Sequence, residues 1–243
     1  MNKLTILNNQ FQAYQTGLAE QQYALHDTML QQENQSSYYI QELTEKDFDE
    51  YAELVGESFE KRDCFSKIFG TKKEAFVKTL HSMKHLILES KCSFLARHKQ
   101  TNEIGGGQCG IDYLADHDCK ADEKVQYVLD MLDKAKNQCI ELGLIDPNLK
   151  YLDITWSFSR EGHENQGLQK ILSRYSDLRA KEKGYDYTLC EATHQITLNN
   201  ALKVGYELIS LFEPVKFFKK EIAEQYNIPS DLKTGICIKS LDW

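Results

Sequence analysis

The sequence predicts an α/β domain in which strands and amphipathic helices alternate along the chain. The run Tyr151–Ser159 is rich in β-branched and aromatic residues, which favour a buried strand. A glycine-containing turn and then Gly167–Lys183 follow, and the apolar residues of this second run recur at helical spacing. Two further β-rich runs, Cys92–His98 and Ile104–Tyr113, flank the turn signal Gln100–Glu103 and predict a hairpin. A strand–turn–helix unit beside a hairpin indicates a sheet covered by helices.

The first half of the domain contains one strand and three helices besides this hairpin. A strand is expected at Tyr38–Glu42. A start at Thr44 that resembles a capping box predicts a helix running to about Phe59. Thr71–Ser90 has the apolar periodicity of a second helix, and Asp122–Leu142 that of a third. A glycine and a proline beyond the third helix mark its end.

The second half continues with three more strands. Four apolar residues alternate along the strand 151–159 and predict one buried face: Leu152, Ile154, Trp156 and Phe158. Gly184 ends the following helix, and Tyr185–Ala192 reads as a short strand before a helix that ends at Gly205. After Tyr206–Phe212 and a short helix, a final strand at Gly235–Leu241 closes the sheet.

Residues 1–37 differ from the rest of the chain because they are rich in Gln and Asn and carry few charges. Six apolar residues recur there at three- and four-residue steps: Leu4, Leu7, Phe11, Tyr14, Leu18 and Leu25. This stripe predicts an amphipathic helical extension that docks on a protein partner or on a second copy of the domain. A partly disordered leader is the alternative, since Gly17 interrupts the stripe. The chain is therefore expected to consist of this extension and a domain at 38–243.

The composition of the chain limits the kinds of partner and binding site that we expect. The net charge of −8 argues against nucleic acid, because phosphate binding needs a basic face. No apolar run approaches the roughly 20 residues that span a bilayer, so no membrane association is expected. Seven scattered cysteines without a C-x-x-C pair indicate reduced thiols and a cytoplasmic location. The seven histidines show no metal-ligand spacing, and no metal is expected.

Two segments of the second half resemble the acyl-CoA-binding core of the GNAT N-acetyltransferase superfamily. The turn Glu164–Gln169 is similar to the family's Arg/Gln-x-x-Gly-x-Gly/Ala loop, and Glu191–Tyr206 looks like the matching segment of arylalkylamine N-acetyltransferase-like members. Tyr39–Asp47 resembles the family's first strand, and Glu57–Gly70 its substrate-side loop. The resemblance covers roughly residues 38–243. It implies a mixed, mostly antiparallel twisted sheet of about seven strands flanked by helices.

The resemblance also implies a cofactor and a reaction. Acetyl-CoA would be the donor, and its acetyl group would pass to an amine, with a small amine favoured. The pantetheine arm would lie along the fourth strand, at Trp156, Ser157, Phe158 and Ser159. The pyrophosphate would be held by the turn residues Glu164, Asn165, Gln166, Gly167, Leu168 and Gln169. Independently, unpaired N–H groups where a helix begins just past a strand favour an anion.

Two residues of this turn depart from the family pattern. Glu164 stands where a cationic or amide side chain is expected. Two like charges about 5 Å apart at an effective dielectric near 20 cost roughly 3 kcal/mol. Gln169 replaces a small residue where the helix must come close. These departures predict a degenerate pyrophosphate loop. The alternative function is therefore a catalytically degenerate subunit of a larger intracellular or cytoskeletal assembly, anchored by residues 1–37.

The first candidate for the general base is Asp63. It stands where the resembling subgroup has a glutamate, so the resemblance implies a catalytic role. Burial between Phe59 and Phe65 would raise its pKa. The alternative is a solvated loop aspartate paired with Arg62 or Lys61.

Two further residues are candidates for proton transfer. Asp153 lies in the fourth strand, where related amine acetyltransferases place a histidine, and it serves either as a base or as a structural cap. Thr197 matches a serine used in the amine-acetylating subgroup, and its alternative role is an N-terminal helix cap. His194 is expected to be a surface or cap residue.

Overall fold

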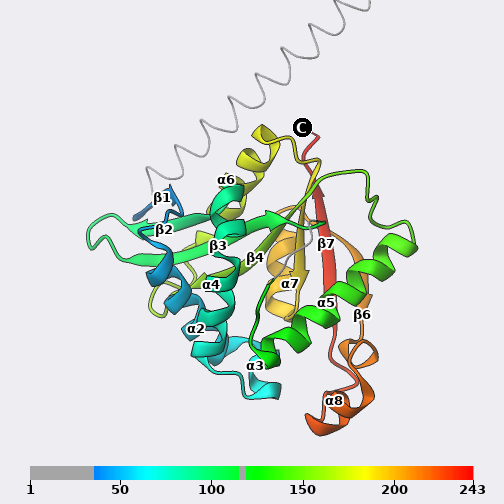
Figure 1. Ribbon diagram of the computed structural model, residues 1–243. Coiled ribbons are helices and arrows are strands. Elements are labelled where there is room, and N and C mark those ends of the chain that lie inside the picture. The colour runs from blue at the N-terminus through cyan, green and yellow to red at the C-terminus, as the bar shows by residue number, and fades with distance from the viewer. Residues whose placement is uncertain (1–35, 115–118, 243) are drawn as a thin grey trace, which may run out of the picture.

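A single sheet forms the centre of the molecule, with helices packed around it (Figure 1), and it has seven strands. The computed structural model describes residues 36–114 and 119–242. The spatial order is β1-β2-β3-β4-β5-β7-β6, and β4 with β5 forms its parallel pair, the other neighbours being antiparallel. The strands are β1 (Tyr38–Glu42), β2 (Phe94–His98), β3 (Ile104–Asp112), β4 (Tyr151–Ser159), β5 (Tyr187–Ala192), β6 (Glu207–Phe212) and β7 (Thr234–Ser240). This confirms the predicted mixed, mostly antiparallel sheet.

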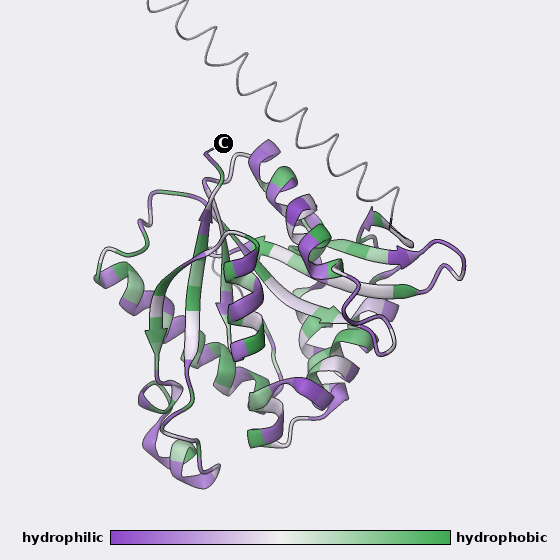
Figure 2. Cartoon of the chain, turned by 180° about the vertical axis from the view of Figure 1, so that it is seen from behind, coloured by the Kyte–Doolittle hydropathy of each residue, from purple (hydrophilic) through white to green (hydrophobic). Residues whose placement is uncertain are grey.

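Helices cover both faces of the sheet. One face carries α2 (Phe48–Arg62), α3 (Cys64–Phe69), α4 (Lys73–Ser90) and α5 (Glu123–Glu141), of which α2, α4 and α5 lie in front of the strands in Figure 1. The other face carries α6 (Leu168–Glu182) and α7 (Gln195–Lys203), whose outward residues are largely hydrophilic in the rear view of Figure 2. After β6 come the 3₁₀ turn η1 (Pro214–Lys216) and α8 (Lys220–Gln225). None of the described helices is long and apolar enough to cross a membrane.

The predicted extension at residues 1–37 lies almost entirely outside the described residues. Its amphipathic helix and the boundary at 38 therefore stay predictions. The first strand does begin at Tyr38, whose side chain is 5% exposed and packs with Leu168 and Leu172 of α6. Tyr38 thus belongs to the hydrophobic core of the described residues.

Helix α3 corrects the expectation of a loop between Phe59 and Gly70. Helix α2 continues to Arg62, and Asp63 then adopts an extended conformation and caps α3 through a hydrogen bond from the Ser66 backbone N–H to its carboxylate. Gly70 ends α3 in the left-handed region, with φ of 62°. A six-residue helix is too short for an amphipathic period to show in the sequence, but its cap and its glycine stop follow ordinary helix chemistry.

The predicted common face of β4 is wrong. Leu152 and Ile154 pack toward α6, whereas Trp156 and Phe158 belong to the core under α2 and α4. The reason is a bulge in β4. Opposite β3, the register moves from Cys109↔Thr155 to Gly107↔Phe158, so β4 carries one extra residue. Trp156 lies within it with φ of 49°, an uncommon conformation for a non-glycine residue.

Strands β4 and β5 separate soon after they begin to pair. Their contacts are Tyr151↔Tyr187, Leu152↔Thr188 and Asp153↔Leu189. Beyond this point β4 continues to Ser159 beside β3, while β5 continues to Ala192 beside β7. We call the resulting gap in the hydrogen-bonded sheet the β4–β5 opening. It leaves residues 154–159 of β4 without a neighbouring strand on one side.

Candidate active site

The turn between β4 and α6, residues 160–167, lies beside the β4–β5 opening. Gly162, Asn165 and Gly167 all have positive φ, and Gly167 is the residue from which α6 starts. An added Cβ at Gly167 would meet nothing within 4 Å, so its backbone conformation rather than crowding favours glycine there. Within the described structure, the backbone N–H groups of residues 165–169 donate no hydrogen bond. We call residues 160–169 the anion loop, because such unpaired N–H groups at a helix start favour an anion.

Glu164 folds back onto this anion loop. Its Oε2 accepts a hydrogen bond from the Gly162 N–H at 2.8 Å, and its Oε1 lies 2.6 Å from Nη2 of Arg62. The N–H groups of Glu164 itself and of Gly162, together with the Arg62 guanidinium, lower the pKa of this carboxyl. The charge at residue 164 is therefore neutralised locally. The repulsion of a pyrophosphate that the sequence predicts is correspondingly smaller.

The backbone carbonyl groups at the C-terminal end of β4 also accept hydrogen bonds from side chains of this chain. Gln169 Nε2 donates to the Phe158 carbonyl at 2.7 Å, and Arg62 Nη1 donates to the Ser159 carbonyl at 2.9 Å. The hydroxyl of Tyr51 donates to the Trp156 carbonyl at 2.8 Å. Of the four residues expected to line a pantetheine arm, Trp156, Phe158 and Ser159 thus have carbonyls that accept from side chains of this chain. Gln169 lies against β4 instead of obstructing the start of α6.

Asp63 lies at the wide end of the β4–β5 opening. Its carboxylate accepts hydrogen bonds from the N–H and hydroxyl of Ser66 at 2.7 and 2.9 Å and from the Thr193 hydroxyl at 3.4 Å. Burial raises the pKa of Asp63, and these hydrogen bonds act in the opposite direction. Its two cationic neighbours in sequence pair elsewhere, Lys61 with Glu161 and Arg62 with Glu164. Asp63 therefore sits in the buried setting that the sequence predicts and is engaged in capping α3.

Asp153 lies at the narrow end of the β4–β5 opening. It is 6% exposed, and its Oδ1 is buried without a hydrogen-bond partner among the described residues. Burial, reinforced by the nearby charge of Glu191, raises the pKa of this carboxyl well above its usual range. From Leu189, opposite Asp153, to Thr193, beside Asp63, β5 and the residue after it extend for roughly 13 Å. The two predicted bases therefore occupy different ends of the opening.

Thr197 is not brought to either carboxylate by a described contact. It is exposed in the first turn of α7, a helix that packs on the face of the sheet opposite α5. The cap of α7 is His194, whose Nδ1 accepts a hydrogen bond from the Ile196 N–H at 3.1 Å. This confirms the expected cap role of His194. The alternative role of Thr197 as a cap is wrong, because His194, three residues earlier, occupies the cap position.

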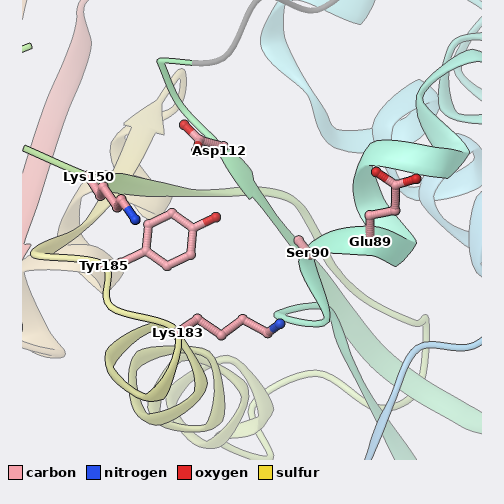
Figure 3. Close-up of a pocket in the computed structure, with 6 residues that line it drawn as sticks. All are labelled: Glu89, Ser90, Asp112, Lys150, Lys183 and Tyr185. Carbon is pink, nitrogen blue, oxygen red and sulfur yellow. The ribbon is translucent and has the colours of Figure 1, made fainter.

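Two surface hollows accompany these features. The larger, of about 400 Å³, is lined by Glu89, Ser90, Asp112, Lys150, Lys183 and Tyr185. Figure 3 shows Tyr185 between Lys150 and Lys183, at the end of the sheet where β4 and β5 begin. This larger hollow is therefore remote from the β4–β5 opening, which lies toward the C-terminal ends of β4 and β5. A smaller hollow of about 90 Å³ lies between α2 and the anion loop, with Arg62 and Arg160 in its wall.

Comparisons with known proteins agree with this geometry. No protein-family model matches the sequence, and no curated protein matches it either. Among solved structures, the C-terminal condensation domain of Ebony, in complex with beta-alanyl-dopamine, has a TM-score of 0.74 at 15% identity and covers 84% of this chain and 98% of its own. Arylalkylamine N-acetyltransferase 2 from Aedes aegypti has a TM-score of 0.68 at 14% identity and covers 85% and 100%. The chain has the GNAT fold.

A further structure with this fold contains the cofactor. The structure of yncA from Salmonella typhimurium with its cofactor acetyl-CoA has a TM-score of 0.51 at 8% identity and covers 86% of this chain and 96% of its own. Acetyl-CoA thus binds to a protein whose structure matches 86% of this chain.

One residue of this GNAT-fold site was missed in the sequence. Glu191 of β5 lies on the same face as Leu189, which packs with α5, and so shares the face of Asp153. The hydroxyl of Tyr113 donates to Glu191 Oε1 at 3.2 Å. The signal was present but weak: a carboxylate two residues after a buried leucine in a short strand. Within the described residues, no group of three potential ligands forms a metal site.

Proposed function

We propose that this protein is an acetyl-CoA-dependent N-acyltransferase that acetylates a small amine. The β4–β5 opening carries the proposal. It places a buried carboxylate, Asp153, in the same gap that runs toward the unpaired N–H groups of the anion loop. Amine acetylation needs both parts, an anion site for the donor and a proton acceptor for the ammonium group. The GNAT fold supports the same reaction class.

The anion loop would hold the pyrophosphate through its backbone. The N–H groups of residues 165–169 are unpaired, and Arg62 and Arg160 stand at the neighbouring hollow. Arg62 would exchange Glu164 for a phosphate oxygen. The side chains of the pair are 41% and 37% exposed, so the freed Glu164 carboxylate would keep the Gly162 N–H and be screened by solvent. The residues present are therefore compatible with the cofactor.

The strand β4 would guide the rest of the donor. The carbonyls of Trp156, Phe158 and Ser159 would become available to the donor only after Tyr51, Gln169 and Arg62 release them. We assign proton acceptance to Asp153, and to Asp63 the capping of α3 at the wide end of the opening. Thr197 receives no role beyond its place near the start of α7.

Calorimetry with acetyl-CoA tests this proposal directly. We expect micromolar binding to the full chain, with desulfo-CoA as a control that keeps the nucleotide and removes the thioester. Both ligands should bind with similar affinity, because the anion loop recognises phosphate. No detectable heat at millimolar acetyl-CoA would contradict the enzyme proposal.

A second candidate function is a structural subunit that has kept the fold without the cofactor. The observation that favours it is the set of internal hydrogen bonds that fill the end of β4 and engage Glu164. In this case residues 1–37 would dock the domain on a protein partner in a cytoplasmic assembly. Deleting residues 1–36 would leave the domain folded and release it from that partner. Size-exclusion chromatography and a pull-down with the full chain as control distinguish this outcome from unfolding.

A further inference from the structure

We propose that Asp153 and Glu191 act as one proton-sharing carboxyl pair that takes the proton from a cationic amine, with Tyr113 positioning Glu191. This inference rests on the proposed function and adds Glu191 and Tyr113 to it. The amine class follows from the pair itself, since an amine that arrives as an ammonium ion must give up a proton before its nitrogen can attack.

The topology of the sheet brings the two carboxyl groups together. Asp153 is the last residue of β4 that pairs with β5, opposite Leu189. Glu191 lies two residues further along β5, on the same face, where the strands have begun to separate. Both side chains therefore meet at the narrow end of the β4–β5 opening.

The two residues differ in access and in partners. Asp153 is 6% exposed and its Oδ1 has no partner in the described structure, which is unusual for a buried carboxylate oxygen. Glu191 is only partly buried, and it accepts one hydrogen bond from Tyr113. A buried oxygen without a partner is a position that a ligand's N–H group can satisfy.

The charged and titratable groups around the pair come from several elements. Helix α5 contributes Lys136 and Asp133, which lie 2.9 Å apart, and Lys136 also lies over the Tyr113 ring. Lys136 favours the ionised form of both carboxyl groups, whereas Asp133 opposes that of Glu191. The thiols of Cys109, Cys139 and Cys190 and the hydroxyl of Tyr206 also sense the charges of the pair. Lys136 forms an ion pair with Asp133, so its charge does not act on the two carboxyl groups alone.

The protonation of the pair follows from this environment. Burial raises the pKa of Glu191 to about 7, and burial together with the Glu191 charge raises that of Asp153. Two close carboxyl groups in a poorly solvated site do not both ionise readily, so near neutral pH they hold a proton between them. A carboxyl group that titrates near the working pH is well suited to general base catalysis.

The proton balance of the step is simple. The ammonium group gives one proton to the pair, which then holds a proton on each carboxyl group. The neutral nitrogen forms the amide bond with the acyl carbon while the carbon–sulfur bond of the thioester breaks. The nitrogen's second proton goes to the thiolate leaving group. The pair later releases its extra proton to water through the partly exposed Glu191.

An infrared titration of the protonated-carboxyl band tests the pair without any cofactor. We expect a titration with a midpoint near 7 in the full chain. Glu191→Gln should remove it and move the remaining Asp153 titration to lower pH, because the neighbouring charge is gone. The matched control is Glu207→Gln, an exposed carboxylate of β6, which should leave the spectrum unchanged. Absence of any carboxyl titration near neutral pH would overturn the proposal.

Turnover separates this inference from the proposed function. Glu191→Gln should lower turnover by roughly 10²–10⁴-fold with acetyl-CoA affinity unchanged, as expected for a lost general base. Tyr113→Phe should keep most of the turnover but move the acid limb of the pH–rate profile upward, because a hydrogen bond that lowers the pKa of Glu191 is lost. Full turnover in Glu191→Gln would overturn the pair alone. Failure of acetyl-CoA to bind would instead overturn the proposed function.

Discussion

The anion loop and the narrow end of the β4–β5 opening differ in how their polar groups are paired. At the anion loop, Glu164, Arg62 and Gln169 satisfy one another and the backbone around them. At the narrow end, Asp153 keeps a buried oxygen without a partner, next to the partly buried Glu191. The chain thus fills the part of the site that would hold the donor and leaves unsatisfied the part that would hold the reacting amine.

The difference in free energy between these regions shows which one is built for a ligand. Surface pairs such as Arg62–Glu164 are screened by solvent and contribute little to stability, so a phosphate can displace them. A buried polar atom without a partner costs roughly 1–3 kcal/mol in the folded state. A site that carries this cost is better explained by function than by stability. We therefore expect the side chains of the anion loop to rearrange when a phosphate binds, whereas the carboxyl pair needs no rearrangement to accept a proton.

The largest effect should come from the narrow end. Asp153→Asn is expected to reduce turnover by roughly 10²–10⁴-fold, because a general base is lost. Asp63→Asn is the comparison at the wide end and should have a much smaller effect, since asparagine also caps helices well. Single-turnover kinetics at saturating acetyl-CoA measures both. If Asp63→Asn proves the more damaging change, the assignment of the two carboxylates is reversed.

A charge placed in the anion loop should have the next largest effect. Gly167→Asp is expected to weaken acetyl-CoA binding about 100-fold, since a like charge about 5 Å from the pyrophosphate costs roughly 3 kcal/mol. Gly167→Asn is the control, because it introduces a side chain of similar size without charge and asparagine tolerates positive φ. Calorimetry should show near-normal binding for Asn. Equal losses in both variants would attribute the effect to the backbone conformation.

The stability of the fold should depend on the carboxyl pair in a defined pH range. The pKa of Glu191 is about 7 in the folded chain, above the usual value near 4.3, so the folded state binds more protons between these values. Its contribution is fully present below about pH 4 and is lost as pH rises through about 7. We expect the free energy of unfolding to fall by about 2 kcal/mol more in the natural chain than in Glu191→Gln between pH 5 and 8. Urea titrations at several pH values measure this difference, and parallel curves for the two chains would contradict it.

The smallest effect concerns the pair that bridges α2 and the anion loop. Glu164→Gln should strengthen acetyl-CoA binding by up to roughly tenfold, because Arg62 is then free for phosphate and the lost surface pair contributes little to stability. Glu161→Gln is a suitable control. Glu161 lies in the same loop and pairs with Lys61 of α2, but it accepts no described hydrogen bond from the backbone. Weaker binding in Glu164→Gln would show that Glu164 supports the loop more than it blocks it.

Much of this fold follows from local patterns in the sequence, and the parts that do not are those set by distant contacts. The seven strands and the long helices appear because alternation and helical spacing repeat over many residues. Helix α3 was missed, since six residues give no period. Glu191 was missed because its role depends on the register of β5 beside β4, which places it near Asp153. The engagement of Glu164 depends likewise on Arg62, about 100 residues earlier in the chain.

The bulge at Trp156 divides β4 into two halves that are out of phase with each other. Before it, even-numbered residues point toward α6. After it, even-numbered residues point toward α2 and α4. Two residues of β4 lie opposite Gln108 alone, so removing one of them would leave Phe158 opposite Gly107 and on its present face. Straightening the strand at its full length would instead place Phe158 opposite Gly106 and turn it toward α6. An alignment that treats β4 as uninterrupted would misplace by one position each residue that leads into the anion loop.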